Sequence, residues 1–176
     1  MAKELEIEIQ VKSLTPARKK LRKLGKLLKK LKSTDYLFND SFLEQDIVLR
    51  LRDIKTQFPK VKREAIVTFK TPRKATAVFQ SRQELEFKAD NFKNVFDFLQ
   101  ALYGKPALQF TWIGEKYEYQ GCTIFLKDTI EIIKFVEIEG KSRKQIEKVQ
   151  KELDIKGEPL KIGALEYAKR KLRGNA

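Results

Sequence analysis

Charged residues recur in pairs spaced two positions apart along the chain. The pairs are Glu6 with Glu8, Arg50 with Arg52, Glu84 with Glu86 after Arg82, and Glu137 with Glu139. Alternate side chains of a β-strand point to the same face, so each pair would project from one side of its strand, about 7 Å apart. Carboxylate oxygens suit Mg²⁺ or Mn²⁺, while Arg and Lys neutralise phosphate oxygens. Faces of this kind, brought together, would bind a polyphosphate with a divalent cation.

A solvated outer face of an antiparallel sheet would explain any one of these pairs equally well. The opposite faces of the same segments are strongly apolar, as in Leu5, Ile7 and Ile9 or in Leu49 and Leu51. Such a sheet can bury its apolar face under helices and curl its charged face inward. Both interpretations remain open at the level of the single strand.

Composition excludes several classes of site. The chain has 176 residues, no histidine and one cysteine, Cys122, which excludes histidine-dependent triads, histidine zinc sites and an intramolecular disulfide. Chemistry must therefore rest on carboxylates, Lys, Arg, Tyr or a hard metal. We expect one domain over 1–176. No run of about 18 apolar residues is present and the N-terminus is charged, so we expect a cytoplasmic protein without a membrane partner.

The elements that must position these residues follow from hydrophobic periodicity and turn signals. Expected strands cover residues 4–12, 34–39, 46–54, 62–70, 76–88, 107–119, 122–127 and 133–139. Expected helices cover about 15–32, a short segment capped by Asp90 or Asn91 and ending at Gly104, 142–153 and 162–172. Many antiparallel-style strands with interspersed helices indicate the α+β class, built on a large sheet or barrel.

The formal net charge of +14 is concentrated in one segment. Nine of the 38 basic residues lie between Arg18 and Lys32, and this stretch contains no acid. Thr15 as cap, Pro16 at the first helical position and leucines at helical spacing predict that it is helical, with the stripe Leu21, Leu24, Leu28 and Leu31. A basic helix over 18–32 is a candidate nucleic-acid contact. The solvated face of an amphipathic helix is the alternative.

Five motifs together resemble those of a known family. They are Glu6-Ile7-Glu8, Leu49-Arg50-Leu51-Arg52, Phe69-Lys70-Thr71-Pro72, Arg82-Gln83-Glu84-Leu85-Glu86 and Phe135-Val136-Glu137-Ile138-Glu139. Their order and approximate spacing resemble the CYTH family of triphosphate tunnel metalloenzymes, from Glu6 to about Tyr167. That family includes class IV adenylate cyclases, thiamine triphosphatases, inorganic triphosphatases and RNA triphosphatases.

The resemblance implies an eight-stranded antiparallel β-barrel, or tunnel, with helices packed outside. It implies a metal-dependent enzyme acting on ATP, thiamine triphosphate or tripolyphosphate, with Mg²⁺ or Mn²⁺ as cofactor. The implied metal ligands are Glu6, Glu8, Glu84, Glu86, Glu137 and Glu139. The implied phosphate ligands are Lys12, Arg50, Arg52, Lys70, Arg82 and Lys116, and Glu6, Glu8, Lys12, Arg50 and Arg52 are the implied catalytic set.

Three positions depart from the family pattern. Gln10 stands where the opening Glu-x-Glu-x-Lys motif has its lysine, Gly114 lies in a stretch that usually carries basic residues, and Lys127 replaces a usual aspartate, with Asp128 shifted to the other strand face. Two alternatives therefore stay open. One is a catalytically weakened polyphosphate- or RNA-binding module on the same fold; the other is a β-rich structural protein with solvated charged faces.

Overall fold

The computed structural model describes residues 2–3, 5–72, 74–75, 80–81, 83–130, 132–160, 163–172 and 174 as one large antiparallel sheet with five helices. The strands are β1 (Ala2–Lys3), β2 (Glu6–Gln10), β3 (Lys26–Phe38), β4 (Val48–Phe58), β5 (Lys62–Lys70), β6 (Lys74–Ala75), β7 (Gln80–Ser81), β8 (Gln83–Ala89), β9 (Leu108–Tyr119), β10 (Cys122–Thr129), β11 (Ile133–Glu139) and β12 (Glu158–Pro159). The helices are α1 (Thr15–Leu24), α2 (Asp40–Glu44), α3 (Phe92–Tyr103), α4 (Arg143–Glu152) and α5 (Gly163–Leu172).

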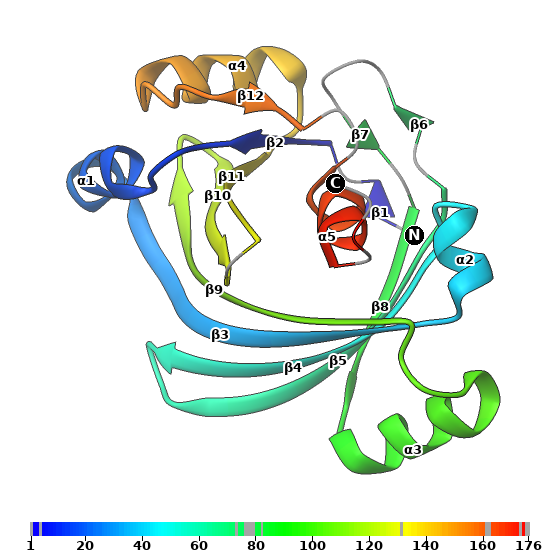
Figure 1. Cartoon of the computed structure of the whole chain (residues 1–176). Coiled ribbons are helices and arrows are strands. Elements are labelled where there is room, and N and C mark those ends of the chain that lie inside the picture. Colours follow the sequence, from blue (N-terminus) through cyan, green and yellow to red (C-terminus); the bar gives the residue numbers. More distant parts are fainter. Residues whose placement is uncertain are drawn as a thin grey trace.

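The sheet curves until its two ends nearly meet. The strand order is β1-β8-β5-β4-β3-β9-β10-β11-β2-β7-β6, with β12 beside β2. Among the described residues these pairings do not close the expected eight-stranded barrel, although eight of the twelve strands are longer than two residues. The next-to-last strands of this order are nevertheless close along the chain, because β7 ends at Ser81 and β8 begins at Gln83. Two residues of extended chain span only about 7 Å, which forces the strong curvature visible in Figure 1.

Helices cover the apolar outer face of this sheet in two places. α1 and α4 cover β2, β9, β10 and β11, where Leu21, Ile124 and Ile146 are fully buried. α3 covers β3, β4 and β5, where Phe96 packs edge-on against Phe38. α5 departs from the expected outside packing. It lies within the outline of the curved sheet (Figure 1), and its Tyr167 packs against a cluster containing Phe135.

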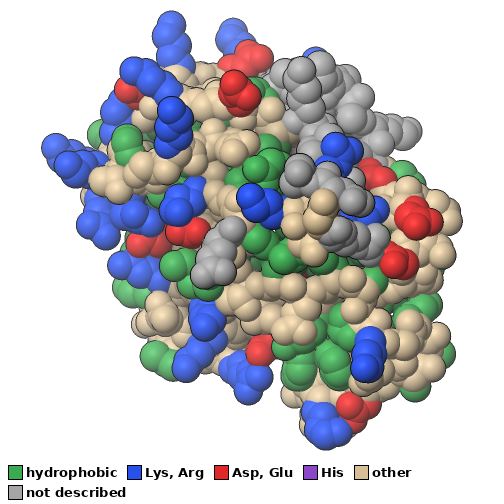
Figure 2. Space-filling view, viewed as in Figure 1, with side chains coloured by type: hydrophobic (Ala, Val, Ile, Leu, Met, Phe, Trp, Pro, Cys, Tyr) green, Lys and Arg blue, Asp and Glu red, His purple; other side chains and the backbone are tan. Residues whose placement is uncertain are grey.

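The expected helix over 15–32 is wrong in its second half. The chain is helical only to Leu24, and Lys26 begins the long strand β3, which pairs with both β4 and β9. These backbone pairings outweigh the helical spacing of the leucines, and Leu24 is 56% exposed. The basic residues from Arg18 to Lys32 are therefore divided between a helix and a strand, and the continuous basic helix is not formed. Figure 2 still shows Lys and Arg side chains gathered on the side of the molecule that carries α1.

Other boundaries agree more closely with the sequence. Asn91 caps α3, accepting a hydrogen bond from the backbone N–H of Asn94 at 3.1 Å, and α3 ends before Gly104. Leu14, not Thr15, is the cap of α1, and Pro16 lies in its first turn. The strand expected over 76–88 falls partly on 76–79 and 82, which lie outside the described residues. The sequence did not predict α2. None of the described helices has the length and apolar character to span a membrane.

Candidate functional site

A cavity of about 310 Å³ on the inner face of the sheet collects most of the predicted site residues. Its lining includes Glu6, Glu8, Arg50, Arg52, Lys70, Glu84, Glu86, Lys116, Glu137 and Glu139. Lys12 does not line it and is exposed beyond the end of β2. Arg82 lies outside the described residues. Asp35, Lys29 and Lys127 also line the cavity, so seven carboxylates and six cationic groups of the described part of the chain meet there.

Four carboxylates oppose one another across β2 and β11. Glu6 is the register partner of Glu139, and Glu8 is the partner of Glu137. Directly opposed residues of antiparallel strands have Cβ atoms about 5 Å apart. Two negative charges at that separation repel by about 3 kcal/mol at an effective dielectric of about 20. A bound metal ion, or a Lys or Arg side chain of the protein itself, would reduce the repulsion between the glutamates of this wall.

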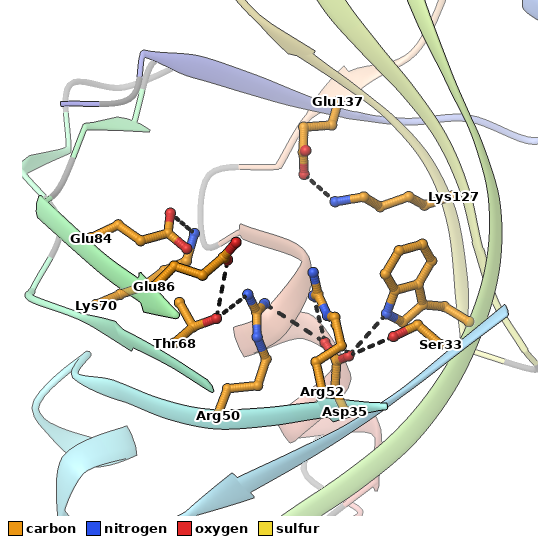
Figure 3. Close-up of polar contacts among 11 residues, drawn as sticks. Ser33, Asp35, Arg50, Arg52, Thr68, Lys70, Glu84, Glu86, Lys127 and Glu137 are labelled. Atoms are coloured by element: carbon orange, nitrogen blue, oxygen red, sulfur yellow. Dashed lines mark hydrogen bonds and ion pairs between the residues drawn. The ribbon is translucent and has the colours of Figure 1, made fainter. Parts of the chain in front are cut away.

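Asp35 organises the basic wall, although the sequence motifs do not include it. The side chain lies on β3 and is 2% exposed. It accepts two hydrogen bonds from Arg52, both at 2.7 Å, and one each from the Trp112 indole N–H and the Ser33 hydroxyl at 3.2 Å. Figure 3 shows Arg52 and Ser33 converging on this carboxylate. A signal was available, because Asp35 is a lone carboxyl on a strand face shared with Leu31 and Leu37.

The charges around Asp35 shift its ionisation and that of Arg50. Burial raises the Asp35 pKa, but the charges of Arg52 and Arg50 and the hydrogen bonds from Arg52 and Trp112 together lower it to about 2. Burial and the neighbouring charge of Arg52 lower the pKa of Arg50 to about 10, against the attraction of Asp35. Both groups remain charged at neutral pH, and Arg52 is fixed in position by its ion pair.

Arg50 is the less satisfied of the two guanidinium groups. Its Nη2 donates to the Thr68 hydroxyl at 3.1 Å, and its Nη1 lies 3.7 Å from Asp35. The Thr68 hydroxyl donates in turn to Glu86 at 3.3 Å. The buried Nε of Arg50 has no hydrogen-bond partner within the described part of the chain. The Arg50 side chain is 13% exposed and lines the cavity, so its partly satisfied guanidinium is a candidate donor to a phosphate oxygen.

A second basic feature joins β3 and β9. Lys29 is the register partner of Lys116, and both side chains line the cavity. Like charges placed directly opposite each other destabilise a sheet. An anion between these ammonium groups would remove that repulsion.

The cavity wall gives a physical reason for one departure from the family pattern, at Gly114, and shows where another, Lys127, is placed. A Cβ on Gly114 would lie 2.8 Å from the Leu126 carbonyl oxygen and 3.1 Å from Cζ3 of Trp112, so no side chain fits there. The indole of Trp112 occupies the space that a basic side chain would need. Lys127 lines the cavity and Asp128 does not, as the one-residue shift predicts.

The donor set fits a divalent cation that binds together with substrate. Among the described residues, no group of three carboxylates converges closely enough to hold a metal ion by itself. Mg²⁺, however, is commonly bound by one or two carboxylates plus substrate phosphates rather than by an all-protein cage. Each opposed pair of β2 and β11 supplies two carboxylates, the number that such a substrate-completed Mg²⁺ site needs from the protein.

Comparisons with known proteins agree with this fold. The family model described as CYTH domain matches residues 4–170. The PH1819 protein of Pyrococcus horikoshii has a similar structure, with a TM-score of 0.80 and 24% identity over 96% of this chain and 99% of that one. A proposed adenylate cyclase of Vibrio parahaemolyticus gives a TM-score of 0.77 and 11% identity, over 94% and 97% of the two chains. HpAC1 of Hippeastrum, described with a dominant triphosphatase activity, gives 0.67 and 14%, over 96% of both. No curated protein matches the sequence.

Proposed function

The chain belongs to the CYTH domain family, and from this premise we propose that it binds a triphosphate with Mg²⁺ or Mn²⁺ in the cavity of its sheet and converts it enzymatically. We propose further that the sheet surrounds the substrate as a tunnel and that residues 1–176 act as one domain. The two reactions we propose are hydrolysis of a triphosphate and cyclisation of ATP, as in class IV adenylate cyclases.

One observation carries the proposal: the cavity brings the arginines of β4 and the opposed Glu pairs of β2 and β11 to different walls, with Asp35 and Glu84 beside the basic groups and Lys127 beside Glu137. Arg50 and Arg52 come from β4 and Lys70 from β5, while the opposed Glu pairs come from β2 and β11. A triphosphate placed between these walls would meet cationic donors on one side. A divalent cation on the other side would neutralise the charge that develops on the phosphate oxygens.

The residues then have distinct roles in the proposal. Arg50, through its partly satisfied guanidinium group, and Lys116 beside Lys29 bind phosphate oxygens directly. Arg52, locked by Asp35, holds a fixed positive charge beside them. Fixed groups of this kind cost little reorganisation when charge develops in a transition state. The metal roles of the glutamates, and the phosphate roles of Lys12 and Arg82, stay predictions.

The nature of the attacking group separates the two reactions. Water attacking the γ-phosphorus releases orthophosphate, whereas the ribose 3′-hydroxyl of ATP attacking the α-phosphorus releases pyrophosphate and forms cyclic AMP. The similarity to HpAC1 and to the Vibrio protein supports testing both outcomes. The apolar side chains of Leu31, Ile54 and Phe110 also line the cavity, which leaves room for an organic part of the substrate.

A catalytically weakened polyphosphate- or RNA-binding module is the second candidate, and specific observations favour it. Arg52 already donates two hydrogen bonds to Asp35, Gly114 leaves no room for a base, and Lys12 lies outside the cavity. Binding would then persist on Arg50 and the lysines while turnover is lost.

Product analysis decides between these candidates. The purified chain is incubated with ATP, thiamine triphosphate and tripolyphosphate, each with Mg²⁺ or Mn²⁺, and the products are separated by ion-exchange chromatography. Orthophosphate indicates a triphosphatase, and cyclic AMP with pyrophosphate indicates a cyclase. Calorimetric binding without any product supports the module. Neither binding nor product with any of the three substrates would refute the proposed function. The variant R50Q should reduce both binding and turnover.

A further inference from the structure

Lys127 forms an ion pair inside the cavity with one of the predicted metal ligands. Its Nζ lies 2.5 Å from Oε2 of Glu137, and the two side chains are only 13% and 14% exposed. The residues come from the neighbouring strands β10 and β11, and both line the cavity. Figure 3 shows the ammonium directed at the carboxylate, apart from the Asp35 cluster.

Three aromatic rings hold this ammonium in place. Nζ lies 4.8 Å from the ring centroid of Phe125, 5.4 Å from that of Trp112 and 5.5 Å from that of Phe135. Cation–π attraction is strongest where the cation is shielded from water, as it is here. The Lys127–Glu137 pair is therefore a fixed part of the cavity wall rather than an exposed, mobile contact.

A second lysine neutralises another predicted metal ligand. Lys70 lies 2.8 Å from Glu84, and these side chains are 10% and 11% exposed. Each of two acidic sets, the one on β8 and the one across β2 and β11, thus already contains a cation supplied by the protein.

On the basis of the proposed function, we propose that Lys127 takes the place of one divalent ion at Glu137, so that the chain binds a triphosphate with a single Mg²⁺ or Mn²⁺ rather than two. An ammonium in hydrogen-bond contact with Glu137 occupies the space that an ion ligated by the same oxygen would need, since Mg²⁺–oxygen distances are about 2.0–2.1 Å. Its positive charge also repels a divalent ion at that point. Lys127 would in turn donate hydrogen bonds to a phosphate oxygen.

Counting bound Mn²⁺ tests this inference. The full chain with saturating tripolyphosphate is titrated with Mn²⁺, and free Mn²⁺ is followed by electron paramagnetic resonance after subtracting a protein-free tripolyphosphate control. We expect one Mn²⁺ per chain for the wild type and for K127R, which keeps the charge. We expect two for K127M, which keeps the aliphatic stem and frees Glu137. The double variant K127M/E137Q should return to one. K134M is the matched control, because Lys134 is exposed on β11 and outside the cavity, and it should not change the count.

The outcomes separate this inference from the proposed function. Two ions in the wild type, or one ion in a K127M variant whose thermal unfolding shows it to be folded, would overturn the role of Lys127 while leaving triphosphate binding intact. Failure of the wild type to bind tripolyphosphate with Mn²⁺ would overturn both. If K127M does not fold, K127Q replaces it: one Mn²⁺ in the wild type and two in K127Q would support the role of Lys127, and any other pair of counts would overturn it.

Discussion

At the scale of single residues, Asp35 determines how the two arginines of β4 are used. Its carboxylate is buried and is shared between a bidentate contact to Arg52 and a longer contact to Arg50. Removing one member of a buried ion pair lowers the free energy of unfolding by more than the pair contributes, because the remaining charge stays buried without a partner. Asp35 is thus a structural residue of the fold and a positioning residue of the candidate site.

We expect D35N to lower the free energy of unfolding by about 3–5 kcal/mol, because it leaves the Arg52 guanidinium without its counter-charge. Urea denaturation at neutral pH measures this. D53N is the matched control, since Asp53 accepts the same two-point contact from Arg63, whose side chain is 69% exposed. That variant should lose no more than about 1 kcal/mol. Equal losses in the two variants would contradict the buried role of Asp35.

The lowered pKa of Asp35 also predicts how stability depends on acidity. The folded-state value of about 2 lies below the ordinary value of 3.8, so the contribution is present above about pH 4 and is lost as the pH falls toward 2. A difference of about 2 pK units corresponds to roughly 2–3 kcal/mol. Between pH 5 and pH 2.5, urea midpoints should therefore fall less for D35N than for the wild type. Parallel falls would show that Asp35 is not the group responsible, since the other carboxylates are common to both proteins.

At the scale of elements, the strands could be predicted because one face of each is apolar and the other charged. The bounds of β5 and β11 coincide with the expected 62–70 and 133–139. The segment after Leu24 could not be assigned in this way. Leu21, Leu24, Leu28 and Leu31 fit a helical stripe locally, and only the partners supplied by β4 and β9 favour a strand. Those strands lie outside the segment in the sequence, so its local hydrophobic periodicity cannot predict that it pairs with them.

Two leucines test where the apolar face of α1 ends. In the continuous helix expected from the sequence, Leu21 and Leu24 would both lie on the apolar stripe. Leu21 is fully buried beneath α1, whereas Leu24 is 56% exposed. We expect L21A to cost about 2–5 kcal/mol of unfolding free energy through lost burial and a cavity. We expect L24A to change it by no more than about 0.5 kcal/mol. Comparable losses in urea denaturation would favour the longer helix expected from the sequence.

At the scale of the whole molecule, the site exists because the sheet brings distant strands around one cavity. The sequence indicated which charges belong together, because each strand carries them at alternate positions. It did not indicate their pairing within the cavity. The contacts of Asp35 with Arg52 and of Lys127 with Glu137 depend on strand order and register, which no single segment specifies. The packing of Trp112 over Gly114 likewise depends on the neighbouring strand, through Leu126.

The mixture of charges in the cavity predicts that metal and triphosphate bind together. Among the described residues, seven carboxylates line the cavity beside six cationic groups, so a triphosphate alone would meet carboxylates as well as cations, and no three of these carboxylates converge on an ion alone. We therefore expect Mg²⁺ alone and tripolyphosphate alone to raise the melting temperature little. Together, at about 100 times the dissociation constant, they should add about 2.7 kcal/mol, or roughly 5–10 °C for a chain of this size.

Thermal scans of the four combinations, with and without Mg²⁺ and tripolyphosphate, measure this coupling. R50Q should lose most of the joint shift, because it removes from the cavity lining a positive charge that makes a 3.1 Å hydrogen bond to Thr68 and a 3.7 Å contact with Asp35. R63Q, which removes an exposed guanidinium that pairs with Asp53, should keep it. A full shift with Mg²⁺ alone would mean that the glutamates form a metal site by themselves. The divalent ion would then bind to the protein in the absence of substrate, without the phosphates that complete its coordination in our proposal.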